Sequence, residues 1–141
     1  MTFPLAGLLR VRGVQERVAA EEAARARADA RAAEAAEQHA VSSLSALATQ
    51  IDDPATLRAM AAARAAGQAS LADLQILSRL RRTEAAEAED AHVDARRELK
   101  GLERLEGAHR SRELEERART EQNALDEIAT TRAGRSEGSA A

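Results

Sequence analysis

Apolar positions repeat with a helical period, most clearly near the end of the chain. Six positions there are spaced by 4, 3, 4, 3 and 4 residues: Leu114, Ala118, Glu121, Leu125, Ile128 and Arg132. This is the period of a coiled-coil seam, here with polar members. Two further apolar stripes are Ala91, Ala95, Leu99 and Leu102, and Leu8, Val11, Val14 and Val18, the latter fading into alanine between residues 19 and 36. The pattern predicts long helices with narrow contact faces.

Sparse glycine and proline residues divide the predicted helical region into three helices, at about 4–51, 54–66 and 70–132. Asp53 can cap the second helix, with Pro54 at its first position. Gly67 suits the C-terminal cap of that helix, and Ser70 with Asp73 resembles a capping box at the start of the third. Residues 134–141, rich in Gly, Ser and Ala, are expected to form a disordered tail.

The lengths of the first and third helices match if the chain doubles back around residues 54–84. The alanine-rich stretch 19–36 would then face Leu102, Leu105 and Leu114, small residues opposite large ones. At the open end, Leu5, Leu8 and Leu9 would meet Leu125 and Ile128. We therefore predict an all-α fold over residues 1–133, a single long antiparallel two-helix coiled-coil hairpin with a short extra helix at the bend. The same seams could also pair between two chains, so a monomer and a dimer both remain open.

Large apolar residues are densest at the predicted bend, where they cover more than one side of a helix: Leu57, Met60, Leu71, Leu74, Ile76, Leu77 and Leu80. Two interpretations fit this cluster. Helix 54–66 could fold onto the others as a small terminal core. Alternatively, part of the cluster stays exposed as a docking patch, because contiguous exposed apolar surface usually marks an interface.

Composition argues against a thick core. The chain has one Phe and no Trp, Tyr or Cys, and most of its 44% hydrophobic residues are alanines, which bury little area. Charged residues make up 32%, with 21 basic and 24 acidic side chains interleaved along the sequence, as on solvated helices. A net charge of −3 and the lack of stacking aromatic residues argue against nucleic-acid binding.

No pattern in the sequence indicates chemistry. His39, His92 and His109 are isolated from other metal-ligating residues, so we expect no metal site, and no phosphate loop or nucleophile motif is present. Two thin helices cannot enclose and desolvate a pair of carboxylates for acid–base work. We expect a non-enzymatic protein with no catalytic residue, cofactor or small-molecule substrate. No apolar stretch approaches the roughly 20 residues of a membrane span, and we expect a soluble, cytoplasmic protein.

The two ends of the chain together resemble the flagellar export chaperone family FliJ. The opening Phe-Pro-Leu-Ala-Gly-Leu-Leu-Arg-Val-Arg (3–12) is similar to the Phe-x-Leu and Leu-x-Arg start of that family. Arg-Thr-Glu-Gln-Asn-Ala-Leu-Asp-Glu-Ile-Ala (119–129) is similar to its closing pattern. The chain departs from the family in its middle segment, where members commonly carry aromatic residues and this chain has Ser42, Ser45, Leu74 and Ile76.

The resemblance implies a cytoplasmic part of the flagellar type III export apparatus, held peripherally at its membrane-embedded components. Its partners would be the export ATPase hexamer, the export gate membrane protein and other export chaperones, and it would act as a chaperone and as a stalk that regulates the ATPase ring. The implied ATPase contact is the open end, with Leu5, Leu8, Val11, Val14, Leu125, Ile128 and Arg132. The implied gate contact is the middle segment, with Leu74, Ile76, Leu77 and Leu80. The alternative is a passive coiled-coil scaffold, or a stalk subunit of a rotary ATPase-type assembly.

Overall fold

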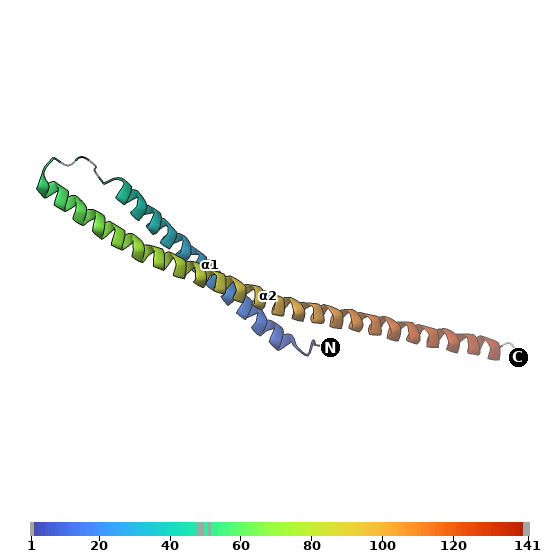
Figure 1. The fold of residues 1–141 in the computed structure, drawn as a ribbon. Coiled ribbons are helices and arrows are strands. Elements are labelled where there is room, and N and C mark those ends of the chain that lie inside the picture. Colours follow the sequence, from blue (N-terminus) through green and yellow to red (C-terminus); the bar gives the residue numbers. More distant parts are fainter. Residues whose placement is uncertain (1, 48–49, 51, 140–141) are drawn as a thin grey trace. The chain divides into compact units, whose positions relative to one another are not determined.

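Two long helices make up almost all of the protein. The computed structural model describes residues 2–47, 50 and 52–139, and all regular structure within them is helical (Figure 1). Helix α1 spans Ala6–Ser45 and helix α2 spans Pro54–Gly138, 40 and 85 residues respectively. The predicted all-α hairpin of two long helices is confirmed.

The reversal of the chain lies between the two helices and not within residues 54–84. The backbone N–H of Thr56 donates a 2.9 Å hydrogen bond to Asp53 Oδ1, so Asp53 caps α2 and Pro54 occupies its first turn, as predicted. Helix α1 ends at Ser45, earlier than the predicted residue 51. Residues 48, 49 and 51 lie outside the described residues.

The predicted extra helix at the bend is wrong, because α2 runs without a break from Pro54 to Gly138. Gly67 does not cap a helix, and no described residue has a positive φ. Its role is packing, since a Cβ at Gly67 would lie 2.5 Å from Leu44 Cδ2. The predicted disordered tail is also wrong over 134–138, where the helix continues to Gly138 and Ser139 N–H still bonds to Arg135 O. Residues 140 and 141 are not described.

Contacts divide the chain into two compact units, and each pairs part of α1 with part of α2. Unit 1 comprises residues 1–13 and 97–141, and unit 2 comprises Val14–Arg96. The predicted single hairpin over 1–133 stays a prediction.

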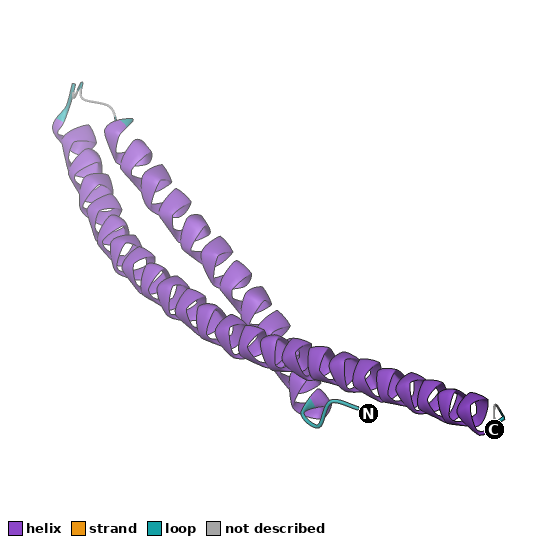
Figure 2. Cartoon of the chain, turned by 90° about the vertical axis from the view of Figure 1, so that its right-hand side faces the viewer, coloured by secondary structure: helices purple, strands orange, loops and turns teal. Residues whose placement is uncertain are grey.

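Unit 2 is an antiparallel helix pair. Three ion pairs join the two helices, and the residue number falls on α2 as it rises on α1. They are Glu16 with His92, Arg27 with Glu89, and Glu34 with Arg82. Figure 2 shows both helices extending to the same side of the connection between them, so the chain runs in opposite directions along the two. Contact positions on α2 in this unit follow spacings of 4 and 3: Gly67, Leu71, Leu74, Ser78, Arg81, Ala85, Ala88, His92 and Ala95. The interlocked side chains of a coiled coil remain a prediction.

Unit 1 sets the register at the open end, and it differs from the predicted one. Arg12 pairs with Glu98, and the ring of Phe3 lies 5.5 Å from the ring of His109. The alanine-rich stretch of α1 likewise faces α2 residues around Arg82 and Glu89, not Leu102 to Leu114. The predicted register is wrong by roughly 20 residues, because the chain reverses before Pro54.

The contact between the helices is thin. Among the described residues only Ala23, Ala33 and Ser78 are buried, at 0%, 7% and 1% exposure. The chain exposes 10805 Å², whereas a compact 15.1 kDa monomer exposes about 7,100 Å². Much of the large apolar surface is therefore not covered by the chain itself.

Candidate docking surfaces

The apolar residues at the start of α1 are exposed, and Leu8 borders a groove that it shares with α2. Leu5, Leu8, Val11, Val14 and Val18 are all exposed. Less exposed positions on α1 include Leu9 in unit 1 and Ala20 and Ala23 in unit 2. Beside Leu8, unit 1 has an open groove whose α2 wall includes Gly101, Leu102 and the exposed Leu105. The stripe is thus available to a partner.

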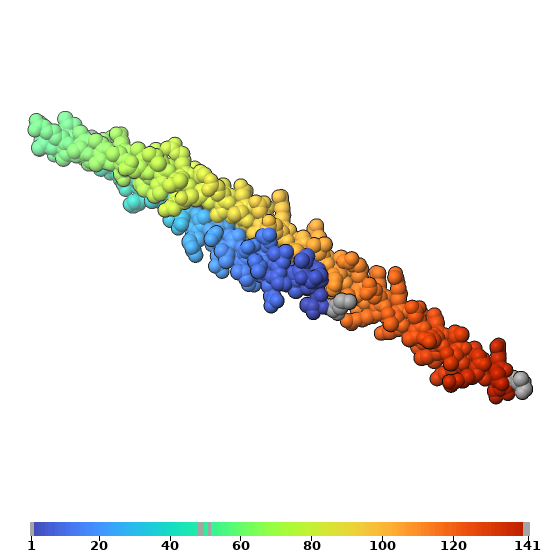
Figure 3. Space-filling view, turned by 90° about the horizontal axis from the view of Figure 1, so that it is seen from below, coloured from blue at the N-terminus to red at the C-terminus, as the bar shows by residue number. Residues whose placement is uncertain are grey.

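The last part of α2 has no other segment of the described chain against it. Every described residue from Leu114 to Ser139 is exposed, and the space-filling view shows this end of unit 1 continuing past the N-terminal segment (Figure 3). Leu114 and Leu125 are each 61% exposed and Ile128 is 51% exposed. We call the six spaced positions from Leu114 to Arg132 the tail stripe.

The tail stripe is not a continuation of the face that contacts α1. In unit 1 that face runs through Leu99, Leu102, Glu106, His109 and Glu113. The same spacing beyond Glu113 would pass through polar residues: Glu116, Thr120, Asn123, Glu127 and Thr130. Beyond the N-terminal end of the chain, the positions that would continue the contact face are therefore polar. The apolar tail stripe lies on a different side of α2.

The two halves of the predicted ATPase contact lie apart. Phe3 packs near His109, which is 16 positions before Leu125, or about 24 Å along a helix. The prediction that Leu5, Leu8 and Leu9 meet Leu125 and Ile128 is therefore wrong. Unit 1 presents two separate apolar surfaces, one at the start of α1 and one on the tail stripe.

The middle cluster divides between packing and exposure. Leu74 lies at the contact between the helices, lining the groove with Leu44 and Gly67. Ile76 is 60% exposed, and Leu80 is also exposed, one turn further along the same side of α2. Leu77 borders Ala33 at the edge of the contact and is partly exposed. A folded-back helix 54–66 cannot cover them, because residues 54–66 belong to the same continuous helix.

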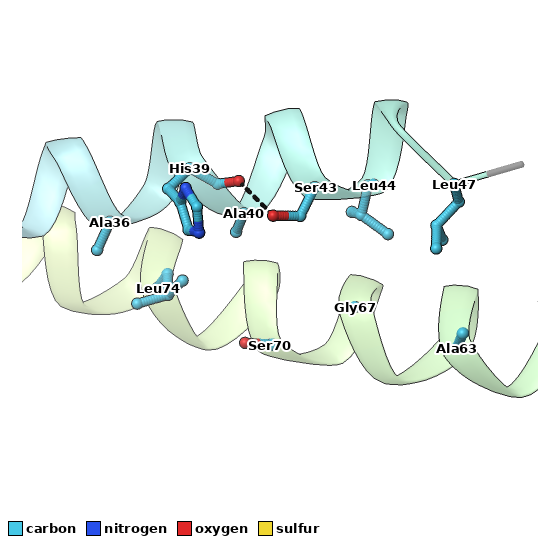
Figure 4. Close-up of a pocket in the computed structure, with 10 residues that line it drawn as sticks. All are labelled: Ala36, His39, Ala40, Ser43, Leu44, Leu47, Ala63, Gly67, Ser70 and Leu74. Carbon is cyan, nitrogen blue, oxygen red and sulfur yellow. Dashed lines mark hydrogen bonds between the residues drawn. The ribbon is translucent and has the colours of Figure 1, made fainter.

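A groove between the helices lies close to the chain reversal. It encloses about 390 Å³ and is lined mainly by small and aliphatic side chains: Ala36, His39, Ala40, Ser43, Leu44, Leu47, Ala63, Gly67, Ser70 and Leu74. Figure 4 shows Leu44 and Leu74 projecting into the space between the helices, with Gly67 on the facing turn of α2. Ser43 Oγ donates a 2.9 Å hydrogen bond to His39 O, so that hydroxyl is satisfied within its own helix. The groove is an apolar packing feature with few polar groups directed into it.

Charge pairs position the helices. His92 Nε2 lies 2.9 Å from Glu16 Oε1, and both side chains are mostly buried, so the pair has an ionic part when His92 is protonated. The other pairs between helices are more exposed, and such pairs contribute about 0–1 kcal/mol each. Sequence reasoning placed His92 in isolation, because nothing local identifies a partner 76 residues away.

The pKa values of Asp53 and Arg81 are shifted by hydrogen bonds to nearby residues of α2. Hydrogen bonds from the side chain and the backbone N–H of Thr56 hold the pKa of Asp53 below its usual range. A hydrogen bond to Glu84, with the charge of that carboxylate, raises the pKa of Arg81. Both shifts stabilise charged forms at a helix start or on a helix face, which is a structural role.

Over the described ranges, no group of three or more His, Cys, Asp or Glu residues is placed to hold a metal ion. No helix in the described part of the chain is long and apolar enough to cross a membrane. Ser78 Oγ is buried and has no hydrogen-bond partner among these residues, a feature that only the helix pairing reveals.

The fold and these surfaces define an all-α helical hairpin with exposed apolar stripes. No protein-family model matches the chain, and searches of the curated proteins and of the solved structures found no match either.

Proposed function

We propose that the chain is a non-enzymatic binding protein of the flagellar type III export apparatus, a chaperone that also docks in the export ATPase ring and regulates it. One observation carries the proposal: a continuous 85-residue helix extends beyond its partner helix and carries large aliphatic side chains that no described residue covers. Exposed, contiguous apolar surface of this kind marks interfaces. The sequence resemblance to the FliJ family supplies the identity of the partner.

The tail stripe contains the proposed ATPase contact, and Leu125, Ile128 and Arg132 are the stripe residues that we assign to it. A single helix is narrow enough to enter a ring, and side chains spaced by one or two turns can meet successive subunits. Leu5, Leu8 and Val11 form a second proposed contact in unit 1, distinct from the first, and Val14 is exposed in unit 2. Mixed charges around both stripes keep the contacts polar at their edges and therefore reversible.

Ile76 and Leu80 are the proposed contact for the export gate membrane protein, with Leu77 at its border. They are exposed on one side of α2 in unit 2, whereas Leu74 is held in the packing against α1. In this proposal, Leu74 does not touch the gate protein directly but holds this part of α2 against α1. The chain is cytoplasmic and reaches the membrane-embedded apparatus only through its partners, and it escorts other export chaperones.

The test is ATP hydrolysis by the export ATPase of the same organism, measured with and without the chain. The wild-type chain changes the rate, and Ile128→Glu abolishes the change. Thr120→Glu is the matched control, because Thr120 is exposed on the polar side of the same helix segment. A passive scaffold would leave the rate unaltered by any variant. Unchanged ATP hydrolysis together with normal motility after deletion of the gene would refute the proposed function.

A further inference from the structure

The tail stripe has two apolar and two charged members in its last four positions, in the order Glu121, Leu125, Ile128 and Arg132. All four are exposed. The order is acid, aliphatic, aliphatic, base, so it becomes complementary to itself when one copy is reversed. This self-complementarity is a property of the described helix, and it does not depend on the proposed function.

We propose that two copies of the chain pair through the tail stripe as antiparallel helices, related by a two-fold axis between Asp126 and Glu127. In this register Leu125 of one copy lies against Ile128 of the second copy, and Glu121 lies against Arg132 of the second copy. The two-fold axis repeats each contact, as in any symmetric dimer of identical chains. Four layers form, two apolar in the centre and one acid–base layer at either side.

A parallel pair is disfavoured by the same four positions. In register, it would place Glu121 against Glu121 and Arg132 against Arg132 of the second copy. Like charges that face each other across a helix seam oppose association. In coiled coils, opposite charges on the positions that flank the seam usually set the orientation of the helices. The charge order of these four positions therefore favours the antiparallel direction.

The flanks of the stripe permit close approach. The positions beside the central layers are Gln122, Ala124, Ala129 and Thr131. None is charged, so reversed copies meet no repulsion there, and small side chains let the two helix axes come near. Gln122 Nε2 already donates to Asp126 Oδ1 on the outer side of its own helix. No rearrangement of α2 is needed for the pairing.

The proposed interface is short, and we expect it to be weak. The four layers from Glu121 to Arg132 span 12 positions, or about 18 Å of helix. Such a contact falls in the weak class of interfaces, below about 1,200 Å² of total buried area. We therefore expect a weak dimer that forms only as the protein concentration rises.

Sedimentation equilibrium of the full chain tests the charge layers. The wild-type mass rises from 15.1 kDa toward twice that value as the concentration increases. Glu121→Arg and Arg132→Glu each stay monomeric alone, but an equal mixture of the two associates, and so does the double variant E121R/R132E. Glu127→Arg, on the outer polar side, associates like the wild type. A wild-type chain that stays at 15.1 kDa at every concentration measured, or single reversals that associate normally, would overturn the proposal.

Disulfide formation tests the direction independently, because the chain has no cysteine of its own. Ala118 and Arg135 would share a layer in the antiparallel register, so a mixture of Ala118→Cys and Arg135→Cys chains gives mixed disulfides. Each variant alone gives none, since its two sulfurs lie about 26 Å apart along the helix and a disulfide needs Cα atoms within about 7 Å. Homodisulfides from either variant alone would show a parallel pair and overturn the assignment. Neither outcome depends on any effect on an ATPase.

Discussion

Gly67→Ala is the substitution whose outcome the helix packing decides most sharply. Gly67 is helical and lies on the face of α2 that contacts α1. In an exposed helix interior, Gly→Ala stabilises by about 1 kcal/mol, because alanine loses less backbone entropy. At this position the new Cβ would lie 2.5 Å from Leu44 Cδ2 and 3.2 Å from Leu44 Cγ. The Leu44 side chain would have to leave its place between the helices.

Overpacking of this kind costs about 1–3 kcal/mol. Offset by the helix-propensity gain of about 1 kcal/mol, Gly67→Ala should lower the free energy of unfolding by about 0–2 kcal/mol. Gly107→Ala is the matched control, since Gly107 is in the same helix and nothing lies within 4 Å of its added Cβ. That control should gain about 1 kcal/mol, so the two variants should differ by about 1–3 kcal/mol.

Urea unfolding followed by circular dichroism measures both variants. In a Leu44→Ala background the clash is absent, so Gly67→Ala should there stabilise like the control, and the double-mutant cycle should show a coupling of about 1–3 kcal/mol. If Gly67→Ala stabilises the wild-type chain as much as Gly107→Ala does, the close approach of the helices at Leu44 is refuted.

Three further predictions follow from the packing of α2. Leu74→Ala should lower the free energy of unfolding by about 1–2 kcal/mol in urea titrations, since Leu74 is half-buried, whereas Ile76→Ala should change it by less than about 0.5 kcal/mol; equal effects would contradict the assigned faces. Ser78→Ala should raise the free energy of unfolding by about 1 kcal/mol, because a buried, unpaired hydroxyl is removed. A lower free energy of unfolding would show that the hydroxyl has a hydrogen-bond partner. The pKa of Asp53 is lowered by Thr56, so its contribution is present above the unfolded-state pKa of about 3.9 and is lost as pH falls through the folded-state pKa. Asp53→Asn keeps the cap without this titration, so wild type should lose stability relative to Asp53→Asn on acidification; parallel pH profiles would contradict the assignment.

Local chemistry was enough to predict where α2 begins. The cap at Asp53 and the first-turn proline at Pro54 act within a few residues, so their effect is visible in the sequence. The role of Gly67 could not be predicted from its neighbours in the sequence. A glycine can end a helix or allow a close neighbour, and only the position of Leu44, 23 positions earlier, distinguishes the two.

The antiparallel arrangement was predicted correctly, but the register was not. An alanine-rich face offers nearly the same surface at every turn, so small-to-large matching fits many alignments of the two helices. In the structure, sparse contacts such as Glu16 with His92 and Phe3 with His109 distinguish one alignment from the others. Such pairs cannot be recognised until the site of chain reversal is known.

The docking surface on the tail stripe was also predicted only in part. The spacing from Leu114 to Arg132 identified an apolar stripe on one helix, and the structure leaves that stripe exposed. The sequence also placed the start of α1 against it, which was wrong because α1 reaches only to about His109. Periodicity identifies which residues share a face, whereas the covering partner depends on the length of chain between the helices.

The exposed tail stripe is proposed to bind the export ATPase. Titration calorimetry of the ATPase with the full chain tests it most directly, using Leu125→Glu on the stripe and Thr120→Glu on the polar side as the matched pair. The account predicts that the wild type and Thr120→Glu bind with the same affinity, while Leu125→Glu binds at least about tenfold more weakly, a loss of about 1.4 kcal/mol. Equal affinity of all three chains, or no binding by the wild type, would contradict it.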